Sequence, residues 1–254
     1  MCIRDRCKYF IEYKRGMEKI LIIVNAEVSE QGKLISASPV TERMVAALRK
    51  GIGSYSSEPV LIEVVSAGSL WSKGGRVVAE DSRTIYCPLT IQLPDYFDFP
   101  AKDIFSACKD IVGRRNWVER NLGYKTSYGD HWLGHLWLPV VLTEKGLLYS
   151  EIIGEGAMPN SYEQPIVLSS RHRQSLHHLA RHLLKSISAI PAVYLIQFSL
   201  HNNEVVFDRI WPFPAAPALA SLRCQEPDLF ACHWQCLSDR QINGLTSLEQ
   251  TMSI

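Results

Sequence analysis

The sequence lacks the features by which several classes of protein are recognised. It has no apolar run near the roughly 18 residues that cross a bilayer, no internal repeat and no low-complexity tract. Apolar residues make up 46% of the chain and charged residues 21%, as in chains that bury a core. These values exclude disorder over most of the 254 residues. We therefore expect a globular protein that does not span or bind a membrane.

An excess of positive charge is also missing. The chain has 27 Lys and Arg against 26 Asp and Glu, and residues 1–16 contain five of the basic side chains but only two of the acidic ones. The remainder therefore has 22 basic and 24 acidic residues, a net charge of −2. General binding to nucleic acid needs a basic excess or stripe. We expect no such binding.

Residues 1–16 also lack the apolar core of a secretory signal. Their first six residues resemble translated adapter sequence, whereas Met17 leads directly into an apolar segment. We expect residues 1–16 to be an artefactual or disordered extension. The alternative is a basic tail of the natural protein.

Cysteine is too sparse for a disulfide framework. Two of the seven cysteines lie in residues 1–16, and the other five are an odd number in a long chain. Reduced thiols in a cytoplasmic protein are the simplest interpretation. Cys224, Cys232, His233 and Cys236 form one loose cluster, whereas a structural zinc site usually takes two tight ligand pairs. We expect buried thiols there.

Common catalytic motifs are absent as well. The glycine pair within residues 72–76 has neither the Walker spacing nor the dinucleotide fingerprint, so a plain turn is favoured over a phosphate-binding loop. No serine has the flanking glycines of a nucleophile elbow. His178 and His182 have the spacing of a helical metal pair but no intervening glutamate, which favours a solvated basic helix face.

The N-terminal pattern predicts a strand–helix–strand unit. Residues 19–26 and 59–65 are apolar runs typical of buried strands. Residues 39–49 between them have a helical period, with Ser38 as a cap and Pro39 in the first turn. This order favours a parallel sheet.

The remaining chain predicts a second group of elements. After a strand at 85–93, a short helix at 101–112 and a polar, aromatic stretch at 113–135, two apolar runs flank a Gly146 turn. The two apolar runs are 136–142 and 147–153. A long amphipathic helix at 170–188 and a two-stranded ribbon at 192–200 and 204–210 follow. The fold class is therefore α/β or α+β, an N-terminal βαβ-type unit followed by a mixed or antiparallel sheet with one long helix. We place these units at 17–112 and 113–254, or in one continuous domain.

The stretch from Leu136 to Cys236 resembles the C-terminal half of ATP-grasp proteins. Its hairpin, amphipathic helix, ribbon and proline-rich exit are closest in layout to the N5-carboxyaminoimidazole ribonucleotide synthetase branch. The second ribbon strand of that family reads Asn-Glu-x-x-Pro-Arg-Pro, and residues 208–214 lie on this frame. The resemblance implies ATP and Mg²⁺ as cofactors and a ligase that joins a carboxylate to its partner through an acyl-phosphate.

The chain departs from the family at the metal site. The two magnesium-ligating carboxylates of the family fall on Gln197 and Arg209. An amide and a guanidinium do not replace anionic ligands, although Arg209 could contact a phosphate directly. Upstream, only about 118 residues separate Met17 from Gly134, and no lysine-bearing nucleotide strand or glycine-rich phosphate loop is recognisable there.

Two functions follow from the resemblance. If the protein is an active ligase, Asp208 and Arg209 are its expected catalytic residues, and Glu204 and Asp208 its metal ligands after a shift of register. The side chains expected to bind nucleotide are Lys145, Glu151 and Glu155. The alternative is a non-catalytic binding or assembly protein that keeps the scaffold and has lost the metal site. Its partner would be a small molecule or a protein, and the sequence does not indicate an oligomeric state.

A third possibility is an unrelated small-molecule enzyme. Its candidate general acid and base groups are Tyr128, His131 and His135, which lie in one segment. A histidine on an aromatic loop is more often structural, so this possibility ranks below the other two.

Overall fold

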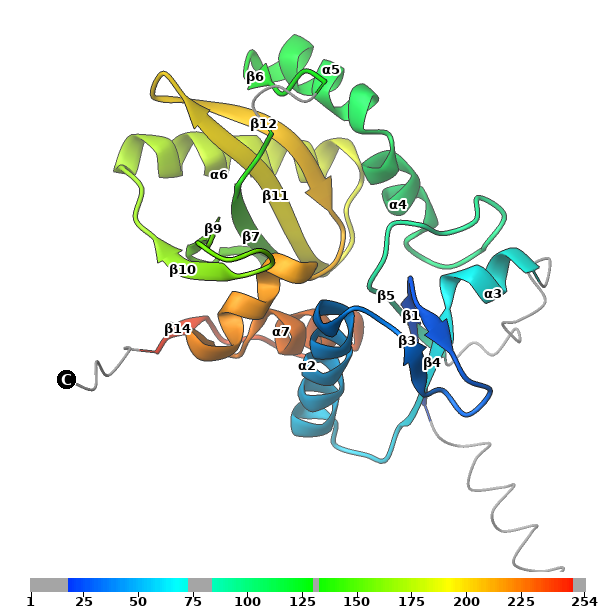
Figure 1. Cartoon of the computed structure of the whole chain (residues 1–254). Helices are drawn as coiled ribbons and strands as arrows, with labels where there is room; N and C mark the ends of the chain where they lie inside the picture. The colour runs from blue at the N-terminus through cyan, green and yellow to red at the C-terminus, as the bar shows by residue number, and fades with distance from the viewer. Residues whose placement is uncertain (1–17, 73–83, 130–132, 249–254) are drawn as a thin grey trace, which may run out of the picture.

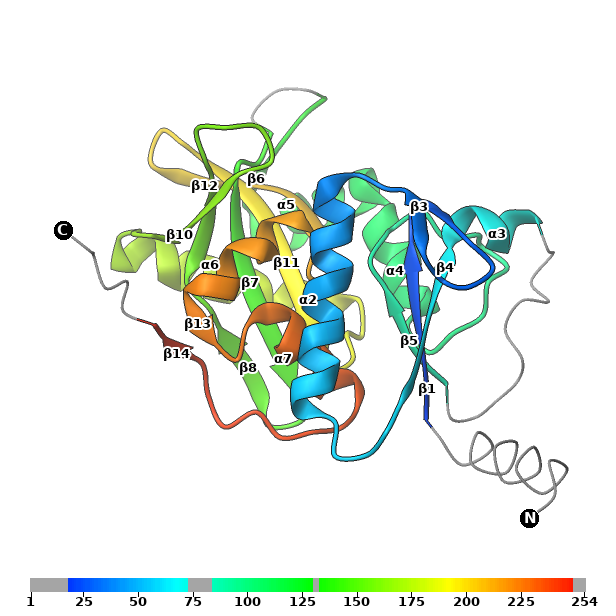
Figure 2. The same ribbon diagram turned by 60° about the horizontal axis from the view of Figure 1, so that its bottom comes forward.

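A computed structural model describes residues 18–72, 84–129 and 133–248. The described chain forms a small sheet and a large sheet, with helices between and around them (Figures 1 and 2). No helix in these ranges combines the length and apolarity needed to cross a membrane. The structure confirms an α/β architecture with both parallel and antiparallel pairing.

The small sheet is the predicted parallel unit. Its central strand β1 (Lys19–Val24) pairs in parallel with β4 (Leu61–Ser66) and with β5 (Thr84–Pro88). Helix α2 (Pro39–Tyr55) connects β1 to β4, and the Ser38 hydroxyl accepts a hydrogen bond from the Thr41 amide at its start. The βαβ prediction is confirmed, but the strand expected over 85–93 ends at Pro88.

The large sheet has the order β10-β9-β7-β11-β12-β6, with β8 paired beside β7. Its strands pair antiparallel except β6, which runs parallel to β12. The strand bounds are β6 Lys125–Thr126, β7 Leu136–Thr143, β8 Gly146–Tyr149, β9 Ile152–Glu155, β10 Tyr162–Ile166, β11 Ala192–His201 and β12 Glu204–Trp211. Helix α6 (Ser170–Ser186) packs its apolar side on this sheet. The predicted turn at Gly146, the long helix and the ribbon are confirmed, but the strand expected over 147–153 divides into β8 and β9 at residues 150–151.

Residues 113–122 belong to a helix that we did not predict. Helices α4 (Lys102–Lys109) and α5 (Ile111–Leu122) follow each other, whereas the sequence over 113–135 was recognised only as polar and aromatic. Within α5 only Val118 is buried, and the apolar period that marks a helix is therefore missing. Its ends do have local signals, since Asp110 caps the start and Gly123 ends the helix in the left-handed conformation.

The shorter elements complete the chain. They are β2 (Glu27–Val28), β3 (Leu34–Ser36), α3 (Ala67–Ser72), the 3-10 helix η1 (Ala216–Arg223), β13 (Gln225–Glu226), α7 (Leu229–Leu237) and β14 (Thr246–Ser247). Strands β2 and β3 pair with each other, as do β13 and β14.

Helix α7 lies between the two sheets and joins their cores. It contacts α2 on one side and strands β7 and β11 on the other (Figure 2). One apolar cluster therefore includes Ile22 of β1, Leu48 of α2, Trp234 of α7 and Val193 of β11. A second cluster fills the space between α6 and the large sheet. The units that we placed at 17–112 and 113–254 share a core.

The histidine of the loose cysteine cluster is part of this core. The buried His233 accepts a hydrogen bond at Nδ1 from the Val193 amide, 3.2 Å away. Burial lowers the pKa of His233 to about 3, so its ring is neutral at pH 7 and serves as an acceptor. Cys232 and Cys236 beside it are buried, and burial raises the pKa of both thiols.

Candidate functional site

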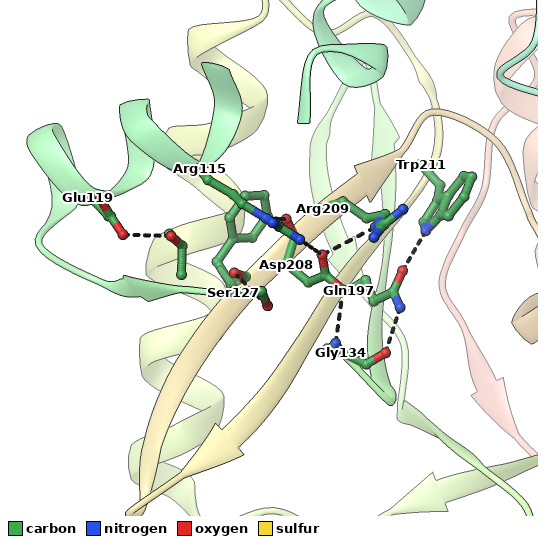
Figure 3. Close-up of polar contacts among 10 residues, drawn as sticks. Arg115, Glu119, Ser127, Gly134, Gln197, Asp208, Arg209 and Trp211 are labelled. Atoms are coloured by element: carbon green, nitrogen blue, oxygen red, sulfur yellow. Dashed lines mark hydrogen bonds and ion pairs between the residues drawn. The ribbon is translucent and has the colours of Figure 1, made fainter. Parts of the chain in front are cut away.

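Strands β11 and β12 bring together the two positions to which the sequence resemblance assigns the magnesium-binding carboxylates of the ATP-grasp family. Gln197 of β11 and Arg209 of β12 are direct partners in the antiparallel register. Asp208 precedes Arg209 on β12, and the three side chains lie close together in Figure 3. The sheet therefore places these side chains beside each other, as the resemblance predicts, but with different chemistry.

Asp208 is a fully buried carboxylate with a partner on each oxygen. Its Oδ1 accepts a hydrogen bond from Arg115 Nη2 at 2.5 Å and another from Arg209 Nε at 3.2 Å. Its Oδ2 accepts from the Gly134 amide at 2.9 Å. Arg115 Nε also donates to the Asp208 backbone carbonyl at 3.0 Å. We call Arg115, Asp208 and Arg209 the arginine–aspartate cluster.

Gln197 uses both ends of its carboxamide. Its Nε2 donates to the Gly134 carbonyl at 2.5 Å, and its Oε1 accepts from Trp211 Nε1 at 3.0 Å. The Arg209 guanidinium carbon lies 6.0 Å from the centre of the Trp211 ring. A carboxylate at position 197 would have no N–H group to donate to the Gly134 carbonyl. Glutamine is therefore the side chain that fits these neighbours.

Gly134 links the two side-chain groups through its backbone. Its amide donates to Asp208 and its carbonyl accepts from Gln197. A Cβ at this position would lie 2.6 Å from Gln197 Cγ and 2.8 Å from the Phe198 amide nitrogen. Glycine is needed here because the chain passes so close to β11.

The arginine–aspartate cluster does not fit magnesium. It has two permanently charged guanidinium groups and one carboxylate, whereas Mg²⁺ takes anionic and neutral oxygen ligands. Across the ranges that the structure describes, no group of three or more His, Cys, Asp or Glu is arranged to hold a metal ion.

None of the other predicted site residues forms a hydrogen bond or an ion pair with Asp208 within the described residues. Glu204 begins β12 and forms an ion pair with Lys125 at 2.6 Å, where both side chains are more than half exposed. The amine of Lys145, in the β7–β8 turn, donates to Gln241 Oε1 at 2.9 Å. Glu151 and Glu155 are exposed, one before β9 and one at its end. Of the side chains to which we assigned catalytic, metal-binding or nucleotide-binding roles, only those of Asp208 and Arg209 contact each other. The nucleotide-binding roles stay predictions.

Two residues of the site were not recognised from the sequence. Arg115 lies on α5, a helix that we did not predict, and the Asp110 and Gly123 end signals could have revealed that helix. Gly134 precedes β7 without a local motif to distinguish it. Residues 73–76 of the glycine-containing segment and His131 lie outside the described residues.

The fold is that of an ATP-grasp-like protein. No protein-family model and no curated protein matches the chain. Among solved structures, the chain is similar to N5-carboxyaminoimidazole synthetase from Staphylococcus aureus, with a TM-score of 0.62, 10% identity and coverage of 91% of this chain and 80% of that one. N5-carboxyaminoimidazole ribonucleotide synthetase from Thermotoga maritima has a TM-score of 0.60 and 11% identity, with coverage of 90% of this chain and 78% of that one. The glycinamide-RNase-transformylase T from Mycobacterium tuberculosis has a TM-score of 0.60 and 15% identity, with coverage of 88% of this chain and 80% of that one.

These comparisons confirm the resemblance seen in the sequence at the level of fold. The similar structures include an ADP complex of the S. aureus enzyme and an ATP complex of carboxyaminoimidazole ribonucleotide synthase from Aspergillus clavatus. Identities of 8–15% carry information on fold, and function has to be argued from this chain's own residues.

Proposed function

We propose that this protein is a non-catalytic binding or assembly protein that keeps an ATP-grasp-like scaffold without magnesium-dependent ligase chemistry. The observation that carries the proposal is the arginine–aspartate cluster, which includes Arg209, one of the two positions that the sequence resemblance assigns to the family's metal ligands. In the family these positions hold carboxylates, whereas here Arg209 and Gln197 occupy them.

The charges around Asp208 oppose a divalent cation. One carboxylate with two guanidinium groups leaves a local net charge of +1 in a buried place. A metal ion would have to displace both arginines from Asp208, and each displaced cation would then lack its partner. The cluster instead stabilises the contact between α5 and β12.

A second candidate is an ATP-dependent ligase that forms an acyl-phosphate. It is supported by the nucleotide complexes among the similar structures and by the exposure of Arg209, whose side chain is 27% accessible and could contact a phosphate. In this alternative Lys145, Glu151 and Glu155 would bind the nucleotide. Glu204 would approach the metal.

The two candidates differ in magnesium-dependent nucleotide binding. Isothermal titration calorimetry of the full chain with ATP, with and without Mg²⁺, measures this directly. We expect no micromolar binding that depends on Mg²⁺. Such binding, weakened in an Arg209→Gln variant whose circular dichroism is unchanged, would overturn the non-catalytic proposal and support the ligase. An Arg181→Gln variant on exposed α6 surface is the matched control.

A further inference from the structure

The outer face of helix α6 carries a pair of histidines one turn apart. The helix covers the face of the large sheet that is turned away from α7, and its leucines pack on the strands (Figure 2). His178 and His182 are both exposed. Side chains four residues apart are neighbours on one face of a helix. The two imidazoles therefore meet at the surface, and their ring centres are 4.5 Å apart.

A hydrogen-bonded chain fixes the position of the proton on the His178 ring. The Tyr124 hydroxyl donates to the Ser175 carbonyl at 2.8 Å, which uses its one proton. Towards His178 Nδ1, 3.2 Å away, the same oxygen can only accept. Nδ1 therefore carries the hydrogen, and Nε2 of the neutral ring keeps its lone pair. His178 has no other hydrogen-bond partner among the described residues, so this lone pair is available to a ligand.

The second ring is available as well, and the separation of the two rings suits a metal ion. His182 forms no hydrogen bond or ion pair with a described residue. Two imidazoles that bind one ion at about 2.0–2.1 Å and at right angles have ring centres about 4.5 Å apart, whereas a tetrahedral pair has them about 5 Å apart. The 4.5 Å between His178 and His182 matches the right-angled arrangement. Divalent ions that combine such angles with a preference for imidazole are Ni²⁺ and Cu²⁺.

We infer that His178 and His182 form a binding site for one divalent transition-metal ion of the Ni²⁺ or Cu²⁺ type. Both rings bind the ion through nitrogen, and Tyr124 is a positioning residue that holds His178 in the tautomer with a free Nε2. Water fills the other positions, because the described chain offers no third His, Cys, Asp or Glu for a metal site. The site does not depend on the proposed loss of ligase chemistry, since it shares no residue with the arginine–aspartate cluster.

Isothermal titration calorimetry of the full chain with Ni²⁺ tests the inference, and Mg²⁺ is the comparison ion because it prefers oxygen ligands. We expect Ni²⁺ to bind more tightly than Mg²⁺. His178→Gln and His182→Gln should each weaken Ni²⁺ binding at least about tenfold, because each leaves a single imidazole. Tyr124→Phe should weaken it less, since both ligands remain but the tautomer of His178 is no longer fixed. Unchanged binding in Tyr124→Phe would overturn the positioning role.

The control variant is His177→Gln, which removes the neighbouring histidine, whose ring stacks on Tyr149 at 3.7 Å. It should bind Ni²⁺ as the unchanged protein does. Equal affinity of the His177→Gln, His178→Gln and His182→Gln variants, all with unchanged circular dichroism, would place the ion elsewhere and overturn the inference. Absence of Ni²⁺ binding at millimolar concentration would overturn it as well. Magnesium-dependent ATP binding with an intact Ni²⁺ site would contradict only the proposed function.

Discussion

At the scale of single residues, the side chains around Asp208 bind one another through hydrogen bonds and ion pairs. The strand register places residues 197 and 209 opposite each other, as the resemblance requires. The side chains there form hydrogen bonds to one another and to Gly134. A fully buried carboxylate that pairs with two guanidinium groups is expected to matter for stability.

An Asp208→Asn variant tests this role. Asparagine has nearly the same volume but no charge, so Arg115 and Arg209 would lose their shared counter-charge in a buried place. We expect the free energy of unfolding to fall by about 3–5 kcal/mol, measured by urea denaturation. The control is Asp95→Asn, because Asp95 is 87% exposed and pairs with Lys109 at the surface. That change should cost no more than about 0.5 kcal/mol, and equal losses in both variants would refute the structural role of Asp208.

At the scale of elements, the contact between α2 and α7 depends on one small residue. Gly51 lies in the middle of α2, and a Cβ there would be 2.9 Å from Ala231 Cα and 3.1 Å from the Ala231 amide nitrogen. Both atoms belong to the backbone of α7, so they cannot rotate away. The two helices can approach this closely because Gly51 places no side chain between their backbones.

Two glycine variants in the same helix should shift stability in opposite directions. Gly51→Ala should lower the free energy of unfolding by about 1–3 kcal/mol, because the added methyl group forces the helices apart. Gly53→Ala should raise it by about 0.5–1 kcal/mol, since the new Cβ would meet no atom within 4 Å beyond the neighbouring backbone of α2, and alanine favours the helix. Thermal or urea unfolding of both variants gives the comparison. A stabilised Gly51→Ala protein would mean that the helices can move apart freely.

The elements also show what a sequence can and cannot reveal. Helix α6 was predictable because its leucines repeat with a helical period and are buried on one face. Helix α5 was not, because a mostly solvated helix has no such period. The positions of Gln197 and Arg209 followed from the ribbon pattern, whereas the partner Arg115 is 93 residues from Asp208 in sequence. Long-range polar contacts of this kind leave no local signal.

At the scale of the whole molecule, the shared core couples the two sheets. Residues of β1 and α2 pack in one cluster with residues of α7 and the large sheet, and the Val193 amide of β11 donates to His233 of α7. The core packing therefore shows no gap between the two units that we separated near residue 112. Removing either unit would expose the apolar surface of the other.

This coupling predicts one cooperative unfolding transition. Tryptophan fluorescence and far-ultraviolet circular dichroism, followed through the same urea titration, should give coincident midpoints. The buried Trp137 and Trp234 report on packing around the large sheet and α7, whereas circular dichroism reports on all helices and strands. Two separated transitions would show that the units unfold independently despite the shared cluster.

The carboxamide of Gln197 has a consequence for how such a protein could change over evolution. A Gln197→Glu substitution would place a carboxylate oxygen against the Gly134 carbonyl, and Arg209→Glu would remove one of the two cations that neutralise Asp208. Each single step toward the family's metal site would destabilise the folded chain before a metal could bind. Such a metal site could therefore be built in this fold only through less stable intermediates.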